Sequence, residues 1–247
     1  MFVATAVSIV AGGLARVIVA DSPGSATGPP TRYVNSTVAG VPVNIIYVNL
    51  NHPDVRITAA VAAGGIGSSE LFSSFVHRHQ PSAAINGTFF SKTNWRPIGD
   101  IVIKGQRVHY GGMGTGLCVR PGNAVSFVSV PWGRNVSWEG YDTVICCGPR
   151  LVTAGAVGVN AQAEGFRDSH VLGRGVRTAV GLTHLNRLVL VNTRRACGLT
   201  ELANVMKALE CTDAINFDGG ASTAMHYKGR TITAPGRQLT NVLLVYE

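Results

Sequence analysis

The chain has 247 residues, of which 46% are hydrophobic and 14% charged, and its formal net charge is +8. This composition excludes an intrinsically disordered chain and fits one large domain or two small ones. The positive charge attracts anions, but the arginines are scattered and the longest basic run is Arg194-Arg195. Because nucleic-acid binders carry basic runs interleaved with aromatic residues, we expect no nucleic-acid partner. Most arginines are expected at the surface, and a few are suited to gripping phosphate or carboxylate.

The N-terminal stretch MFVATAVSIVAGGLARVIVA is apolar but is interrupted by Arg16. It is therefore too short and too broken to predict a stable membrane span. It is similar to a signal peptide with Ala20 or Ala26 before the cleavage point, and the linker-like DSPGSATGPPTR follows it. We assign residues 1–33 to this segment and residues 34–247 to one domain, and predict export to the periplasm, the cell envelope or the medium. The alternative is an N-terminal segment that is frayed or forms a strand.

From residue 41 onward, short apolar runs separated by turn residues predict a strand-rich fold. Strands are expected at 41–50, 55–63 and 83–87, in several pieces over 98–130 and over 141–155, and as a hairpin over 176–193. Residues 158–176 are polar and show little periodicity, which predicts a long loop of the kind that often serves function.

Helical spacing of apolar residues predicts two helices. The first spans residues 70–79 with Ser68 or Ser69 as its N-cap, and the second spans 199–210 with Thr200 as its N-cap. The fold class predicted from these elements is α+β, a strand-rich mixed single domain with a few helices packed on the sheets.

The five cysteines show no CxxC spacing, so a zinc site is not predicted. Cys197 and Cys211 bracket the second predicted helix. Either a bridge between them or a set of buried free thiols fits the sequence.

Two stretches share one plan, ELFSSFVHRHQPSAAING and ELANVMKALECTDAINFDGG. Each begins with Glu-Leu, continues as a predicted helix and enters an Ala-Ile-Asn strand that ends in a glycine turn. If the two units pack side by side, their glycine turns NGTFF and DGGAST face one cleft.

The turn DGGAST places Asp218 beside two glycines and two hydroxyl groups. Gly219 and Gly220 can expose backbone N–H groups to an anion, and Ser222 and Thr223 add hydroxyl donors. A carboxylate in such a pocket can act as a base, a nucleophile, a metal ligand or an orienting group. Taken alone, the motif fits equally a plain turn in which the aspartate caps its own backbone.

Two further stretches add polar groups to this picture. In INGTFF, the amide of Asn86 ends a strand and could hold a sugar hydroxyl, while Phe89 and Phe90 could wall a pocket. Arg177 begins a predicted strand and could grip a phosphate, or it could be an ordinary surface arginine.

Six stretches follow one another in an order that resembles the phosphodiester glycosidase family: AINGTFF, GDIVIKGQRV, CGPRLVTAG, RTAVGLTHLNRLVLVNT, GLTELANVMKALECTDAINFDGGASTAMHYKG and PGRQLTNVLLVYE. The resemblance covers roughly residues 40 to 247. It implies a mixed α/β domain and a hydrolase that cleaves sugar-1-phosphodiesters, such as those of N-acetylglucosamine. The implied partner is a glycan or sugar-phosphate.

The resemblance also implies site residues. Its motif positions are Asn86, Arg177, Asp218, Gly219, Gly220 and Ser222, to which we add Thr88, Phe89, Thr223 and Arg237 as substrate-binding candidates. Three departures from the family's usual pattern concern the substrate more than the fold. Thr88 replaces a glycine, Ala221 replaces a third glycine, and Gly236 stands where Glu often precedes the arginine.

The resemblance implies Asp218 as base or nucleophile, with Arg177 and the glycine turn holding the phosphate. Because a phosphate ester leaves as a stable anion, a strong general acid is less necessary than in other glycosidases. Glu164 is our first candidate for a second catalytic carboxylate, ahead of Asp168 and Asp100. No cofactor or metal site is predicted, although Asp218 and Asp100 offer oxygen ligands suited to calcium or magnesium. The alternative function is a non-catalytic carbohydrate-binding envelope protein on the same scaffold.

Overall fold

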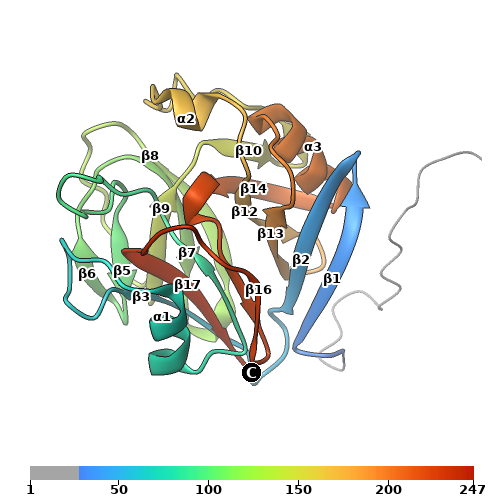
Figure 1. Ribbon diagram of the computed structural model, residues 1–247, viewed down its shortest axis with the longest axis horizontal. Helices are drawn as coiled ribbons and strands as arrows, with labels where there is room; N and C mark the ends of the chain where they lie inside the picture. The colour runs from blue at the N-terminus through green and yellow to red at the C-terminus, as the bar shows by residue number, and fades with distance from the viewer. Residues whose placement is uncertain (1–27) are drawn as a thin grey trace, which may run out of the picture.

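The computed structural model describes residues 28–247, which form three β-sheets with three short α-helices packed against them (Figure 1). Every strand pair among these residues is antiparallel. The expected strand-rich architecture is confirmed. The predicted α+β class is only roughly right. The helices are few and short and the sheets also pack on one another, so the fold is mostly β.

The strand order defines the three sheets. The first is β1 (Thr31–Val38), β2 (Val41–Asn49), β13 (Arg187–Thr193), β12 (Thr178–Thr183), β14 (Cys211–Phe217), β10 (Arg150–Thr153) and β11 (Ala156–Val157). The second is β16 (Arg230–Thr233), β15 (Met225–Tyr227), β4 (Ala83–Asn86), β17 (Asn241–Tyr246) and β3 (Arg56–Val61). The third is β6 (Gln106–His109), β5 (Ile101–Ile103), β9 (Thr143–Cys147), β7 (Gly114–Val119) and β8 (Val125–Val130).

The seven-stranded sheet is buried on both faces, which explains why β2 is an almost continuous apolar run. Because successive strand residues point to opposite faces, Ile45 and Ile46 enter different cores. The core around Ile45 lies between the sheet and helix α3 (Leu199–Ala208). The core around Ile46 is shared with both five-stranded sheets, so all three sheets meet in the centre of the molecule.

Helix α1 (Phe72–His79) packs on the outer face of the second sheet through Phe72 and Phe75. The predicted cap at Ser68 or Ser69 is wrong, because Leu71 occupies the N-cap position without a side-chain bond. The Ser68 hydroxyl instead donates to a carbonyl of the preceding turn.

The N-cap of α3 is Gly198, and the predicted Thr200 lies inside the helix. The carboxylate of Glu201 accepts a hydrogen bond from the Gly198 N–H at 2.9 Å. A Glu at the third helical position therefore reaches back to the cap, as in one half of a capping box, and no hydroxyl cap is needed.

Strand β1 begins at Thr31, inside the predicted linker, and pairs with β2 along its whole length. Its sequence, TRYVNSTV, is polar, as is common at the edge of a sheet, and lacks the apolar run from which the neighbouring strands are predicted. The predicted cleavage points at Ala20 and Ala26 lie outside the described residues. Within residues 28–247, no helix has the length and apolar character needed to cross a membrane.

All five cysteines are buried free thiols, so the alternative of a bridge between Cys197 and Cys211 is not realised. Residues 158–176 form the predicted long connection, which contains only the short helix α2 (Ser169–Leu172).

Candidate functional site

The ends of β4 and β14 meet although they belong to different sheets. The N–H of Asp218 donates to the carbonyl of Gly87 at 3.2 Å, and the Asn86 side-chain amide donates to the carbonyl of Asp218 at 2.6 Å. The two helix-strand units thus bring their glycine turns to one place, as the shared sequence plan predicts. The meeting of the first and second sheets therefore fixes the position of Asp218.

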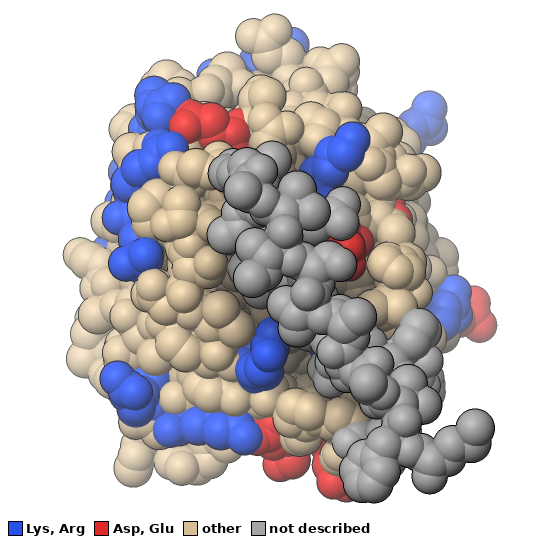
Figure 2. Space-filling view, turned by 90° about the vertical axis from the view of Figure 1, so that its right-hand side faces the viewer, with Lys and Arg blue, Asp and Glu red and all other residues tan. Residues whose placement is uncertain are grey.

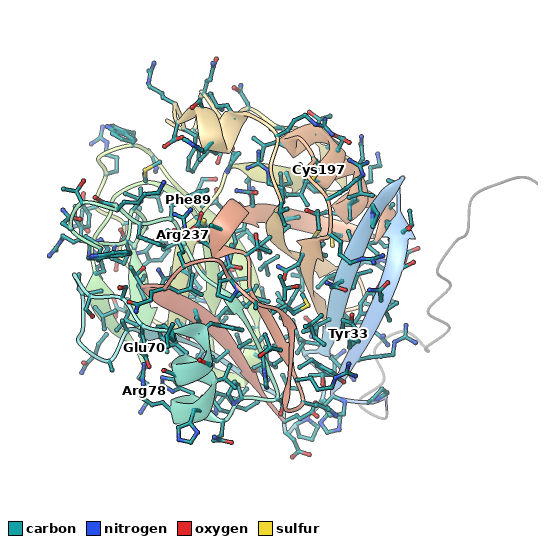
Figure 3. All side chains as sticks on the ribbon, in the orientation of Figure 1. Tyr33, Glu70, Arg78, Phe89, Cys197 and Arg237 are labelled. Atoms are coloured by element: carbon teal, nitrogen blue, oxygen red, sulfur yellow. The ribbon has the colours of Figure 1, made fainter. Side chains whose placement is uncertain are left out.

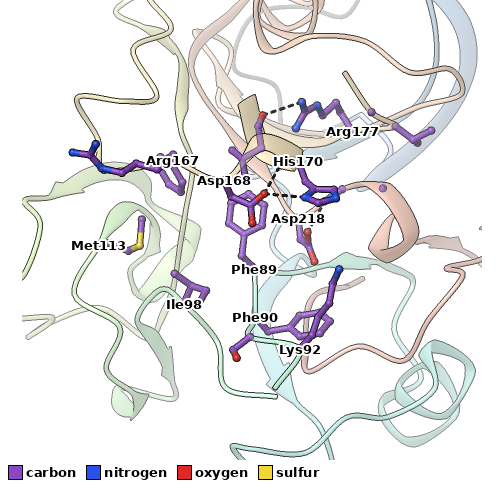
Figure 4. Close-up of a pocket in the computed structure, with 18 of the residues that line it drawn as sticks. Phe89, Phe90, Lys92, Ile98, Met113, Arg167, Asp168, His170, Arg177 and Asp218 are labelled. Atoms are coloured by element: carbon purple, nitrogen blue, oxygen red, sulfur yellow. Dashed lines mark hydrogen bonds and ion pairs between the residues drawn. The ribbon is translucent and has the colours of Figure 1, made fainter. Parts of the chain in front are cut away.

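A pocket of about 600 Å³ opens beside this junction (Figure 4). Its walls come mainly from the turn after β4, from the 158–176 loop and from the turn after β14, and Met113, Trp132 and Arg237 are added from the β6–β7, β8–β9 and β16–β17 connections. The lining residues are Phe89, Phe90, Ser91, Lys92, Ile98, Met113, Trp132, Gly165, Phe166, Arg167, Asp168, His170, Val171, Arg174, Gly175, Val176, Arg177, Asp218, Gly219, Gly220 and Arg237.

Asp218 is partly buried, and burial raises its pKa to about 6. The Ser222 hydroxyl, the Gly219 N–H at 2.8 Å, and the charges of Arg237 and Lys92 oppose this rise by stabilising the ionised form. A carboxyl group with this pKa exchanges its proton near neutral pH, which suits it to acid–base chemistry.

The glycine turn does not offer the anion-binding N–H groups that its sequence predicts. The N–H of Gly219 is bonded to Asp218, and the N–H of Gly220 donates to the carbonyl of Val176 at 2.7 Å. A Cβ on Gly219 would lie 2.6 Å from that same carbonyl oxygen. The glycine is therefore needed for close backbone packing and not for a phosphate cradle.

Asn86 is buried and its hydrogen-bonding capacity is used within the fold. Besides donating to Asp218, its side-chain oxygen accepts from the Thr178 hydroxyl at 2.9 Å and from the Ala224 N–H at 3.0 Å. The side chain of Asn192 extends this chain by donating to Thr178 at 2.9 Å. The amide therefore positions Asp218 and does not face a sugar hydroxyl.

Arg177 is also buried, and it anchors the pocket wall. Its guanidinium donates to the carbonyls of Val171 at 3.0 Å, Cys197 at 3.3 Å and Gly173. Burial lowers its pKa from the ordinary range, and no carboxylate among residues 28–247 opposes this change. Its lining position puts a buried positive charge at the edge of the pocket.

Of the three candidates for a second carboxylate, only Asp168 lines the pocket (Figure 4). Its side chain caps α2 by accepting from the His170 N–H at 2.7 Å, and this bond lowers its pKa. Glu164 lies behind the wall, where its oxygens accept from the Arg150 N–H at 2.9 and 3.1 Å.

Asp100 is fully buried away from the pocket, and both of its oxygens are used. One accepts from the N–H groups of Gly111 and Gly112, and the other from the Trp138 indole. It therefore does not join Asp218 in a metal site. Within the part of the chain that the structure describes, no three His, Cys, Asp or Glu side chains gather as metal ligands.

Three cations line the pocket without a hydrogen bond or ion pair to any residue of the described range 28–247: Lys92, Arg167 and Arg237. Elsewhere basic groups are often paired, as Arg78 is with Glu70 at 2.6 Å. Figure 2 shows Lys and Arg at several separate places on one face, some of them beside Asp or Glu. The unpaired pocket cations are therefore available to an anionic ligand.

Arg237 and Phe89 lie near each other at the pocket, far from the pair Glu70–Arg78 at α1 (Figure 3). The sequence analysis names Arg237 and Phe89 as substrate-binding candidates. It does not name Lys92 and Arg167, because nothing in their local sequence separates them from ordinary surface cations.

The family model for phosphodiester glycosidases matches residues 79–246. The chain belongs to the phosphodiester glycosidase family. The matched range contains every lining residue of the pocket and the whole polar network beneath it. No curated protein matches the chain.

Solved structures show the same fold. The zebrafish N-acetylglucosamine-1-phosphodiester alpha-N-acetylglucosaminidase catalytic domain, auto-inhibited by its pro-peptide, is 21% identical with a TM-score of 0.75, covering 92% of this chain and 86% of that one. A hypothetical protein from Synechocystis is 15% identical with a TM-score of 0.67, covering 87% and 61%. A protein from Burkholderia pseudomallei K96243, named as exported, is 17% identical with a TM-score of 0.58, covering 85% and 76%.

The chain's departures from the family's usual pattern lie at the edge of the site or beneath it. Thr88 is buried, and its hydroxyl has no hydrogen-bond partner of standard geometry among the described residues. The predicted substrate-binding residues Ser222 and Thr223 are also buried and do not line the pocket. Ala221 is exposed and does not line the pocket, and its carbonyl accepts from the Gly236 N–H at 2.8 Å. These positions therefore shape the surroundings of Asp218 without blocking the pocket.

Proposed function

We propose that the protein is a hydrolase that cleaves the glycosidic bond of a sugar-1-phosphodiester. The observation that carries the proposal is one carboxylate of raised pKa, Asp218, in the same pocket as the unpaired cations Lys92 and Arg237. The cations attract the phosphate, and the carboxylate supplies the base. Family membership supports this reaction class.

In the proposed reaction, Asp218 takes a proton from a water molecule that attacks the anomeric carbon. The bond between this carbon and the phosphate oxygen breaks, and its electron pair leaves with the phosphate. The products are the free sugar and a phosphate monoester. Lys92 and Arg237 stabilise the charge that gathers on the departing oxygen, in a partly water-excluded site. Asp218 as a direct nucleophile is the variant of this mechanism with a covalent sugar intermediate.

The other residues support this centre. Asn86 and Arg177 act as positioning residues, because their side chains are bonded to the backbone at Asp218 and in the wall. Asp168 replaces Glu164 as the second carboxylate of the proposal, because of the three candidates Glu164, Asp168 and Asp100 it is the one that lines the pocket. Its lowered pKa keeps it ionised at neutral pH, which suits an orienting group or a base and not an acid.

We propose N-acetylglucosamine as the first sugar to test and a site of action outside the cytoplasm. The names of the zebrafish glycosidase and of the exported Burkholderia protein support these two points.

The test is sugar release from a panel of sugar-1-phosphodiesters, including UDP-N-acetylglucosamine, by wild type, Asp218→Asn and the exposed control Asp54→Asn. We expect Asp218→Asn to lose about a thousandfold in kcat/KM, within the usual range for an acid–base group, and Asp54→Asn to keep full activity. Wild-type kcat/KM should rise with pH through about 6, because the base must be ionised.

Retained activity in Asp218→Asn would show that Asp218 is not the base. Binding of the panel without sugar release from any member would favour the alternative, a carbohydrate-binding protein on this scaffold. A parallel assay with chelator tests for a metal requirement.

A further inference from the structure

The pocket has two halves of different chemistry. One half holds Asp218, Lys92 and Arg237. The other is the apolar chamber, which we define as Phe89, Ile98, Met113, Trp132 and Phe166. Figure 4 shows Met113 and Ile98 on one side of Phe89, with Arg167 on that same side, and Asp218 and Lys92 on its other side. A ligand that fills the whole pocket therefore meets the carboxylate and two cations at one end, and a mainly hydrocarbon surface beside the cation Arg167 at the other.

The chamber is one continuous surface. The rings of Phe89 and Phe166 lie with their centroids 5.9 Å apart, and the Ile98 N–H donates to the carbonyl of Phe89 at 2.8 Å. Trp132 covers Gly165, where an added Cβ would lie 2.7 Å from its ring. The Gly133 N–H donates to the carbonyl of Gly112 at 2.9 Å, which brings the chain at Trp132 beside Met113.

The chemistry of the chamber selects among the groups that a phosphodiester can carry. Among the chamber side chains only the indole N–H of Trp132, at the exposed rim, can donate to a hydroxyl, and Arg167 adds one cation on this side. Most hydroxyl groups of a second sugar would therefore face side chains that offer them no partner, which is unfavourable. A nucleobase stacks best between parallel rings, but the planes of Phe89 and Phe166 are inclined by 59°. Methionine and isoleucine form an adaptable aliphatic surface that suits a flexible hydrocarbon chain.

We propose that the apolar chamber binds an aliphatic alcohol esterified to the phosphate. The substrate class is then a sugar-1-phosphodiester whose second ester group is a hydrocarbon chain. This inference rests on the proposed function for the position of the phosphate and adds the identity of the group beyond it. Trp132, which is 69% exposed, forms the rim through which the chain extends toward solvent.

The test measures binding of ethyl phosphate and hexyl phosphate by titration calorimetry. Both esters present the same phosphate, and only hexyl phosphate reaches into the chamber. Each buried methylene favours binding by a factor of several, so we expect hexyl phosphate to bind at least about tenfold more tightly than ethyl phosphate. Trp132→Ala and Ile98→Ser should shrink this ratio several-fold and leave the affinity for ethyl phosphate unchanged.

Tyr110→Ala is the matched control, because Tyr110 is also an exposed aromatic residue but does not line the pocket. It should keep the wild-type ratio. Equal affinities for the two esters would overturn the hydrocarbon chamber and leave the proposed function standing. If neither ester nor inorganic phosphate binds, the phosphate site itself is wrong, and both the chamber and the proposed function are overturned. The same shrinkage in Tyr110→Ala would also overturn the chamber as the binding surface.

Discussion

The floor and the wall of the pocket are built in different ways. The floor, formed by Asn86, Thr178 and Asp218, lies at strand ends of two sheets and is tied together by buried hydrogen bonds. The wall, residues 158–176, contains little regular structure and is held by side-chain bonds, such as those of Arg177, together with a few backbone bonds to neighbouring segments. Regions with few sheet bonds open locally at low cost, whereas sheet cores open only with global unfolding. The carboxylate is thus placed by the rigid region, while access to it depends on the adjustable one.

Three side-chain interactions attach the wall to the rest of the molecule, in addition to backbone bonds such as those between Gly175 and Cys197. Glu164 accepts from the Arg150 N–H, Arg174 pairs with Glu201 at the start of α3, and Arg177 donates to several carbonyls. Of these side-chain interactions, only that of Arg177 is deeply buried. The difference between floor and wall can therefore be tested by a substitution that removes one set of hydrogen bonds in each region.

The largest effect is expected in the floor, from Asn86→Leu. The substitution keeps the approximate volume but leaves the Thr178 hydroxyl, the Ala224 N–H and the Asp218 carbonyl without their partner. Each unsatisfied buried group costs about 1–3 kcal/mol, so the free energy of unfolding should fall by at least about 3 kcal/mol. Urea unfolding measures the change.

Asn94→Leu is the matched control for this substitution, because Asn94 is exposed. It should change the free energy of unfolding by less than about 1 kcal/mol. A loss in Asn86→Leu no larger than in the control would mean that the floor network contributes little to rigidity, and the contrast with the wall would disappear.

A smaller and more local effect is expected in the wall, from Arg177→Met. The change removes the bonds to Val171, Gly173 and Cys197 but keeps the buried stem of the side chain. We expect the free energy of unfolding to fall by about 2 kcal/mol, because removing the buried guanidinium also removes its desolvation cost, which offsets part of the three lost bonds. Amide hydrogen exchange should speed up in residues 165–176 and stay slow in β14. Equal acceleration in both regions would contradict a separately fastened wall.

The regular elements follow from local patterns, and the sequence predicts them well. Alternating or continuous apolar runs define β2 and the β12–β13 hairpin, and helical spacing defines α1 and α3. Even the meeting of the two glycine turns is predicted, because two similar helix-strand units suggest equivalent placement of their ends. The edge strand β1 is missed because its polar sequence reflects one exposed side and not a linker.

The roles of individual polar residues do not follow from local patterns. Arg177 has the sequence context of a phosphate ligand, yet its guanidinium is used by backbone carbonyls that lie up to twenty residues away. Lys92 looks like a surface lysine, yet the turn after β4 brings it to the pocket. Such assignments depend on which carbonyls and carboxylates tertiary packing leaves unpaired, and this information is not contained in any short stretch.

The last effect concerns the Asp218 carboxylate, whose ionisation lowers the stability of the folded state only above about pH 3.8. The folded pKa of Asp218 is about 6, above the ordinary value of 3.8. The folded state therefore binds more protons than the unfolded state between these values, and stability falls as pH rises through this interval. Below pH 3.8 both states are protonated and the effect vanishes.

Asp218→Asn removes the ionisation and keeps an oxygen that can accept from the Gly219 N–H. We expect the variant to be close to wild type at pH 4 and to be more stable by on the order of 2 kcal/mol at pH 8, somewhat less than the full pKa shift implies because Asp218 is partly exposed and its charge is screened by solvent. Urea unfolding at the two pH values measures the difference, with Asp54→Asn as the control for losing one exposed negative charge. A difference that does not change with pH would show that burial does not destabilise the ionised carboxylate. An inactive but stabilised Asp218→Asn would show that the rigid floor holds its carboxylate at a cost to stability, as expected where a site is selected for chemistry.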